Sequence, residues 1–123
     1  MLRILTENLY QAVKDAYIPK TKQPRADFPI LQHVLLTPAE DGLYTAMTDL
    51  GDSKIGTSIG RWDGEPFATC VPARALKDWL SITRKYTNLI SIEFDSEWEK
   101  IIIQAEDARA EFKCISADEF PPV

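Results

Sequence analysis

The sequence of 123 residues has no long apolar run, a single histidine and only two cysteines. No stretch approaches the roughly 20 apolar residues that a membrane-spanning helix needs. The N-terminal segment MLRILTENLYQ lacks the continuous apolar run and the cleavage site of a signal peptide. We therefore expect a cytoplasmic protein with no membrane partner.

The residue patterns that would indicate an enzyme are also missing. There is no glycine-rich phosphate loop, no cluster of metal ligands and no nucleophile with a base at a recognisable spacing. His33 lies in an apolar strand, where a structural role is favoured, and Asp49 stands where a strand end is capped. We expect no catalytic residue, no metal site and no cofactor.

The two cysteines, Cys70 and Cys114, form no CxxC pair and have no histidine nearby. Both lie in apparent β-strands of a protein from a reducing compartment, where free thiols are commonly buried. Buried thiols are therefore favoured over a disulfide or a ligand role.

The acidic balance of the chain, with a net charge of −5, hides two short basic segments. Each segment has four basic residues and one acidic residue, a local charge of +3, so the other 99 residues carry −11. The first basic segment spans residues 14–25 and the second spans residues 74–85. Their basic residues are Lys14, Lys20, Lys22 and Arg25, and Arg74, Lys77, Arg84 and Lys85.

Apolar spacing predicts two amphipathic helices. The first begins at Glu7 with Thr6 as its N-cap, and Pro19 stops it. The second follows Pro72, a residue tolerated in the first turn of a helix. The expected buried stripes are Leu9, Ala12, Val13, Ala16 and Tyr17 in the first helix, and Ala73, Leu76, Trp79, Leu80 and Thr83 in the second.

Strand-like runs surround these helices and give the same order of elements twice. A strand at residues 1–5 precedes the first helix, and the other runs are 28–37, 43–50, 54–60, 67–71, 88–95, 98–105 and 108–116. The order βαβββ is repeated in residues 1–61 and 66–116, which together predict a single domain over 1–123. We expect an α+β fold in which two helices pack on one face of two antiparallel sheets and bring the basic segments together.

Four motifs, in order, carry a resemblance to a known family. They are FPIL at 28–31 followed by HVLL at 33–36, GLYTAMTDL at 42–50, VPARAL at 71–76 and FKCISADEFPP at 112–122. These segments resemble the N-terminal domain of the bacterial DNA polymerase sliding clamp, the beta subunit of DNA polymerase III. The resemblance spans nearly the whole chain and implies the DNA-clamp fold, with duplicated βαβββ units.

This resemblance implies a non-catalytic processivity factor of DNA replication. In that family three similar domains form one chain, and two chains close head to tail into a homo-oligomeric ring around duplex DNA. The helices face the DNA, and lysine and arginine contacts to phosphate are independent of sequence, which suits a ring that slides. DNA polymerase and the clamp loader bind the family's last domain, which this chain does not match, so no peptide-pocket residue is assigned.

The resemblance also implies DNA-binding residues. Arg74 matches the family's DNA-facing arginine, and Lys77 and Lys85 share its helix face. In the proline-bounded loop, either Lys22 or Arg25 matches the family's loop arginine. For each residue the alternative is a solvated surface charge. Ala75 follows Arg74 where the family often has a second basic residue, which reduces the charge of this helix start.

Phe112 and Cys114 lie on the last strand, an edge that pairs with a neighbouring chain in the family. A free strand edge favours a partner, so these residues are candidates for a subunit interface. Alternatively, one or both side chains point into the core, and strand alternation places both on the same side. The rival function is a single-domain protein-interaction or regulatory module that has the clamp-like fold and does not encircle DNA.

Overall fold

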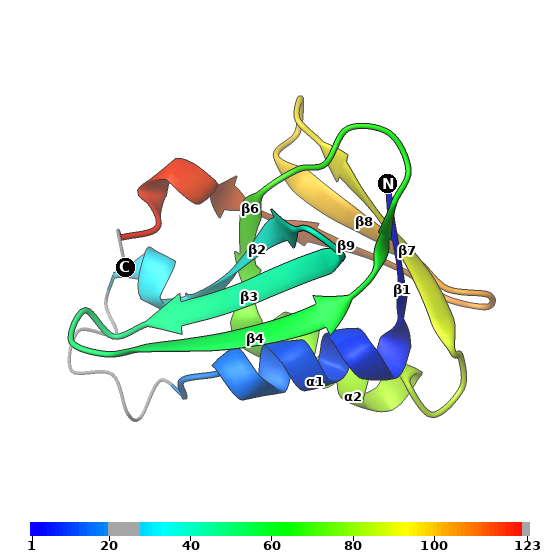
Figure 1. Ribbon diagram of the computed structural model, residues 1–123, viewed down its shortest axis with the longest axis horizontal. Helices are drawn as coiled ribbons and strands as arrows, with labels where there is room; N and C mark the ends of the chain where they lie inside the picture. Colours follow the sequence, from blue (N-terminus) through cyan, green and yellow to red (C-terminus); the bar gives the residue numbers. More distant parts are fainter. Residues whose placement is uncertain (20–27, 122–123) are drawn as a thin grey trace.

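The computed structural model describes residues 1–19 and 28–121, which form two antiparallel sheets and a pair of helices (Figure 1). The helices are α1 (Thr6–Ala16) and α2 (Ala73–Thr83), with short 3-10 helices η2 (Pro29–Gln32) and η3 (Ala117–Glu119). The strands are β1 (Leu2–Leu5), β2 (His33–Ala39), β3 (Gly42–Thr48), β4 (Ser53–Ile59), β5 (Arg61–Trp62), β6 (Thr69–Pro72), β7 (Leu89–Asp95), β8 (Lys100–Gln104), β9 (Arg109–Lys113) and β10 (Ile115–Ser116).

The two βαβββ units exchange their first strands. One sheet has the order β5-β1-β7-β8-β9 and the other has the order β10-β6-β2-β3-β4. Thus β1 pairs with β7 of the second unit, and β6 pairs with β2 of the first, both antiparallel. Because each sheet needs a strand from the other half, the two units depend on each other to fold. The expected α+β clamp architecture is confirmed, with the two-residue strand β5 in addition. The single strand predicted at 108–116 was wrong, because these residues form β9 and β10, which belong to different sheets.

The main core lies where the two helices meet both sheets. Both predicted stripes are buried except for one aromatic side chain each: Tyr17, which directly follows α1, and Trp79 of α2 are partly exposed. Each large side chain here contributes about 1.5–3 kcal/mol by leaving water. The largest buried side chains of the helices and of the two sheets include Leu9, Leu76, Leu80, Leu36, Leu43, Ile92 and Ile101.

A second, smaller core covers the opposite side of the β6–β2–β3 region. Ala46, Cys70 and Phe120 are buried there, and Ile30 and Ile115 pack against them. Two segments that carry the family resemblance therefore meet in space although they lie far apart in the sequence, through Ile30 of FPIL and Phe120 of FKCISADEFPP. Together the two cores give the chain a hydrophobic interior of its own, as expected of a unit that folds independently.

Two other local predictions were wrong. Residues 29–32 form the 3-10 helix η2 instead of a strand, with Pro29 at its start, where the missing N–H costs no helical hydrogen bond. Thr6 is the first residue of α1, and the N-cap is Leu5, with no side-chain cap. The backbone N–H of Thr6 instead donates to Asn88 O at 2.9 Å. A backbone carbonyl just before β7 therefore satisfies an N–H group at the start of α1, and no side chain caps the helix.

Helix α1 is positioned by an unusually close approach to strand β4. The Thr45 hydroxyl donates a buried hydrogen bond to Ala12 O, with an O···O distance of 2.6 Å. Opposite Thr45 in the ladder is Gly56, and a Cβ built there would lie only 2.1 Å from Ala12 O. A side chain at this position would therefore force the backbone of α1 away from the sheet.

We predict that Gly56→Ala destabilises the chain by about 2 kcal/mol or more, because backbone atoms must move to admit the methyl group. Gly51→Ala is the matched control, since the nearest atom to its added Cβ, Asp49 Oδ1, is 3.5 Å away. That control should change stability by less than about 0.5 kcal/mol. Urea denaturation followed by circular dichroism measures both variants, and equal stabilities would show that the α1–β4 contact is not tight.

Candidate nucleic-acid interface

Helices α1 and α2 lie side by side and run in opposite directions, as two matched contacts show. Figure 1 places both along the same side of the molecule, beside β4. The guanidinium of Arg84 lies 4.0 Å from the centre of the Tyr10 ring, and the ammonium of Lys77 lies 5.0 Å from that of Tyr17. The two tyrosines are seven residues apart, and so are the two cations. Lys77, near the start of α2, thus meets Tyr17 at the end of α1, and Arg84, at the end of α2, meets Tyr10 nearer the start of α1.

Arg84 is engaged between the helices and does not belong to the exposed basic face. Its Nη1 donates to both carboxylate oxygens of Glu7, at 2.9 and 3.0 Å, while its guanidinium stacks on Tyr10. The Arg84 side chain is 31% exposed, much less than the 85% of Arg74. The place of Arg84 in the second basic segment did not reveal these contacts, because periodicity does not show what a neighbouring helix brings to a side chain.

The other predicted helix cations are accessible to solvent, as Arg74 is. Arg74 and Lys85 are exposed, and Lys77 is partly exposed beside Tyr17. Lys14 on α1 is exposed as well. It belongs to the first basic segment but was not among the predicted DNA-binding residues. Residues 6–17 and 73–85 contain five basic and three acidic side chains, a net charge of +2 on a chain whose total is −5.

A hollow of about 500 Å³ opens where the end of α1 meets the start of α2. Tyr17 and Pro19 line it on one side, and Arg74, Lys77 and Asp78 line it on the other. Two cations on one concave surface can accept an anionic group such as a phosphate. The loop candidates Lys22 and Arg25 lie outside the described residues, and so does Lys20.

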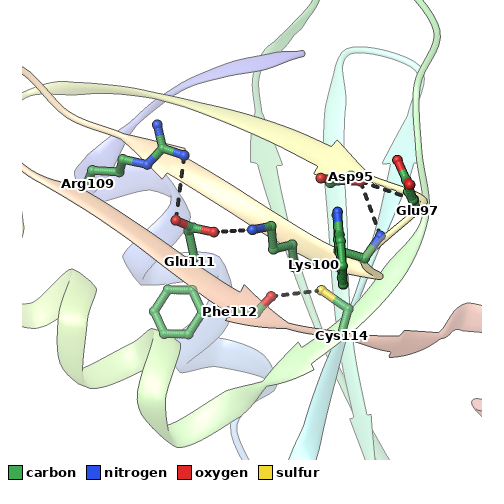
Figure 2. A network of polar contacts seen from close by, with 8 residues as sticks. Asp95, Glu97, Lys100, Arg109, Glu111, Phe112 and Cys114 are labelled. Atoms are coloured by element: carbon green, nitrogen blue, oxygen red, sulfur yellow. Dashed lines mark hydrogen bonds and ion pairs between the residues drawn. The ribbon is translucent and has the colours of Figure 1, made fainter.

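Phe112 and Cys114 point into the interior. Phe112 packs against the main core, and Cys114 is 4% exposed within it. The Cys114 thiol donates to Phe112 O at 3.4 Å, as Figure 2 shows. Of the two readings left open by the sequence, the inward orientation therefore holds for the side chains. Within the described residues, β9 nevertheless ends its sheet, with β8 as its neighbour, so its backbone edge faces outward.

The outer face of β9 carries a charged network (Figure 2). Glu111 bridges Lys100 on β8 and Arg109 on its own strand, the latter at 3.5 Å. The hydrogen bond and charge of Lys100, helped by Arg109, hold the pKa of Glu111 below its ordinary value of 4.5. Charged side chains on an edge strand discourage unspecific pairing with other strands. The sequence pattern of alternating charges in ARAEFK is the signal for this face.

The side chains considered for chemistry have structural partners. The ring of His33 bonds to Pro29 O at 2.6 Å, so its Nδ1 carries the proton and donates. Asp49 Oδ1 accepts from the N–H groups of Gly51 and Asp52, which lowers the pKa of Asp49 and confirms its turn-capping role. Across residues 1–19 and 28–121 there is no group of three potential ligands arranged to hold a metal, and no helix long and apolar enough to cross a membrane.

Comparison with known proteins identifies the same family along the whole chain. The protein family described as DNA polymerase III beta subunit, N-terminal domain, matches residues 1–123 of this chain. A beta sliding clamp from Pseudomonas aeruginosa is 30% identical over 99 residues, which are 80% of this chain and 26% of that protein.

Solved structures give the same result in three dimensions. The DNA polymerase sliding clamp from Caulobacter crescentus matches 99% of this chain and 32% of its own, with a TM-score of 0.84 and 26% identity. The DNA polymerase III subunit beta from P. aeruginosa matches with a TM-score of 0.81 and 26% identity, over 100% of this chain and 32% of its own. The beta subunit from Thermotoga maritima, at 17% identity and a TM-score of 0.80, supports the fold. This chain thus spans about a quarter to a third of the length of these relatives.

We predict that both thiols are unreactive in the folded chain. Cys70 and Cys114 are free and buried, as expected, and burial raises the pKa of Cys70 to about 12 and that of Cys114 in the same direction. A thiol reagent at pH 8 should therefore label the folded chain far more slowly than the urea-unfolded chain. Equal labelling rates would contradict this burial.

The same shift predicts a loss of stability in alkali. Below about pH 9 both states keep the proton of Cys70, whereas between pH 9 and about 12 only the unfolded state loses it. The free energy of unfolding should therefore fall as the pH rises through this range. Cys70→Ala should reduce this fall in urea denaturation at pH 8 and pH 10, and an unchanged pH dependence would contradict the assignment.

Proposed function

Because this chain belongs to the DNA polymerase III beta subunit family, as its N-terminal domain, we propose that it forms one segment of a sliding clamp that encircles duplex DNA. The observation that carries this proposal is the basic surface of the helix pair. It presents Lys14, Arg74, Lys77 and Lys85 on a chain that is acidic elsewhere. Such a surface attracts phosphate without reading sequence, while the acidic remainder repels DNA from the other faces.

The proposed role of each residue follows from its position. Arg74 and Lys77 contact phosphate at the hollow, and Lys85 and Lys14 extend the basic surface along the helices. Lys22 or Arg25 adds a contact from the loop after α1. The proposed function is non-catalytic. Its proposed location is the cytoplasm, because the clamp acts where the DNA is replicated.

The remaining parts of the proposal concern assembly. The edge of β9 pairs with a neighbouring chain in the ring, and Phe112 and Cys114 anchor this strand to the core from below. The replicative polymerase and the clamp loader bind through domains that this chain does not match. Residues 1–123 form a single domain whose units, 1–61 and 66–116, are a structural repeat.

We predict that a duplex of about one helical turn binds the 123-residue chain weakly, in about the millimolar range, at low salt. Amide chemical-shift changes in NMR titrations should cluster on α1 and α2, equally for two unrelated duplex sequences. Charge reversal of Arg74 and Lys77 to Glu should weaken binding and make its salt dependence shallower, since each lost phosphate contact lowers the slope by about 1.

Lys113→Glu is the matched control for reversal of Arg74 alone, because it makes the same change of charge on the exposed side of β9. It should affect the affinity much less than reversal at Arg74. Shift changes that cluster on the outer faces of the sheets, or none at any concentration, would contradict a DNA-facing helix pair and favour a protein-interaction module.

A further inference from the structure

Arg74 differs from the neighbouring lysines in having a carboxylate partner on its own helix. Its Nε lies 3.7 Å from Oδ2 of Asp78, four residues later, and both side chains are largely exposed, at 85% and 62%. Both residues also line the hollow with Tyr17 and Lys77. Within the described residues, neither Lys77 nor Lys85 forms an ion pair.

Helix stability does not account for this pair. Arg74 lies in the first turn of α2, at the positive end of the helix dipole, where a cation is unfavourable. The order basic then acidic is also the weaker orientation for residues four apart, and exposed pairs of this kind contribute little to the stability of a helix. In contrast, the pair of Glu7 and Arg84 joins two helices and is supported by an aromatic ring.

The pair does change what Arg74 offers to an anion. A phosphate that binds the Nε side of the guanidinium competes with Asp78 for that position, and a phosphate that binds the Nη atoms lies close to the negative charge of the same carboxylate. Lys77, held over Tyr17, has no such competitor among the described residues and can take a phosphate without losing an ion pair. The two cations at the hollow should therefore bind phosphate with different strengths, although they lie three residues apart.

We propose that Asp78 competes with DNA phosphate for Arg74 and so keeps this contact weak and short-lived. The inference rests on the proposed DNA-facing role of the helix pair. For a protein that must move along DNA, each phosphate contact has to break readily, and a carboxylate that replaces the departing phosphate makes this easier. Asp78 is thus a residue that tunes the affinity, acting through Arg74 and not by contacting DNA itself.

A double-mutant cycle tests this competition in the 123-residue chain, whose two hydrophobic cores lie within it. The duplex affinity is measured by NMR titration at low salt for wild type, Asp78→Asn, Arg74→Gln and the double variant. Loss of a pair of about 0.4 kcal/mol corresponds to about a twofold tighter complex for Asp78→Asn. In the Arg74→Gln background the same substitution should have a clearly smaller effect.

Asp15→Asn is the matched control for a simple change of charge. Asp15 is exposed on α1 and accepts a hydrogen bond from the uncharged side chain of Gln11, at 2.9 Å. Asp78→Asn should tighten binding more than Asp15→Asn does, and Asp78→Glu should behave like wild type. Unfolding curves of all variants verify that each is folded under the titration conditions.

The outcomes separate this inference from the proposed function. If Arg74→Gln weakens binding but Asp78→Asn tightens it equally in both backgrounds, or no more than Asp15→Asn does, the competition is wrong and the DNA-facing role stands. If Arg74→Gln leaves the affinity and the pattern of shifts unchanged, Arg74 is not a DNA contact and both claims fail. Absence of binding in every variant overturns both as well.

Discussion

The contact between the backbone of α1 and strand β4 positions the whole basic surface. Gly56 on β4 has no side chain, so the backbone of Ala12 can approach this strand closely. The carbonyl oxygen of Ala12 then accepts a hydrogen bond from the hydroxyl of Thr45 on the neighbouring strand β3. Helix α2 is then aligned on α1 through the rings of Tyr10 and Tyr17. Because the interior is close-packed, any displacement of α1 would be passed on to α2 and to the cations at the hollow.

The basic residues of α2 and of the turn that follows it divide into distinct physical roles. Arg84 connects the helices through Glu7 and Tyr10, and Lys77 is held in place by an aromatic ring. Arg74 is exposed but shared with Asp78, and Lys85 is solvated. An acidic chain thus places many cations on one helix for more than one reason. Only a part of that charge is available to a polyanion, which suits weak contacts to many successive phosphates.

Much of the fold follows from the sequence because the two helices are strongly amphipathic and the strands are bounded by turn residues. The buried stripes of α1 and α2 were predictable for this reason, as was the turn capped by Asp49. The exchange of β1 and β6 between the sheets was not, since local patterns do not specify which strand is a partner. Residues 29–32 form a 3-10 helix because Pro29 starts a helical turn without losing a hydrogen bond. In this conformation Ile30 packs against the small core. The role of Arg84 depends on two residues of another helix, which lie more than 70 positions away.

A hybrid clamp tests the central claim, that the helix pair faces duplex DNA inside a ring, most directly. Residues 1–123 would replace the matching N-terminal domain of the P. aeruginosa clamp, and the assembled ring would be loaded onto nicked circular DNA. The account predicts that the hybrid stays on circular DNA and leaves when the DNA is linearised, and that reversal of Arg74 and Lys77 to Glu reduces the amount retained. An assembled hybrid ring that leaves circular and linear DNA equally fast, or whose retention is unaffected by both reversals, would contradict it.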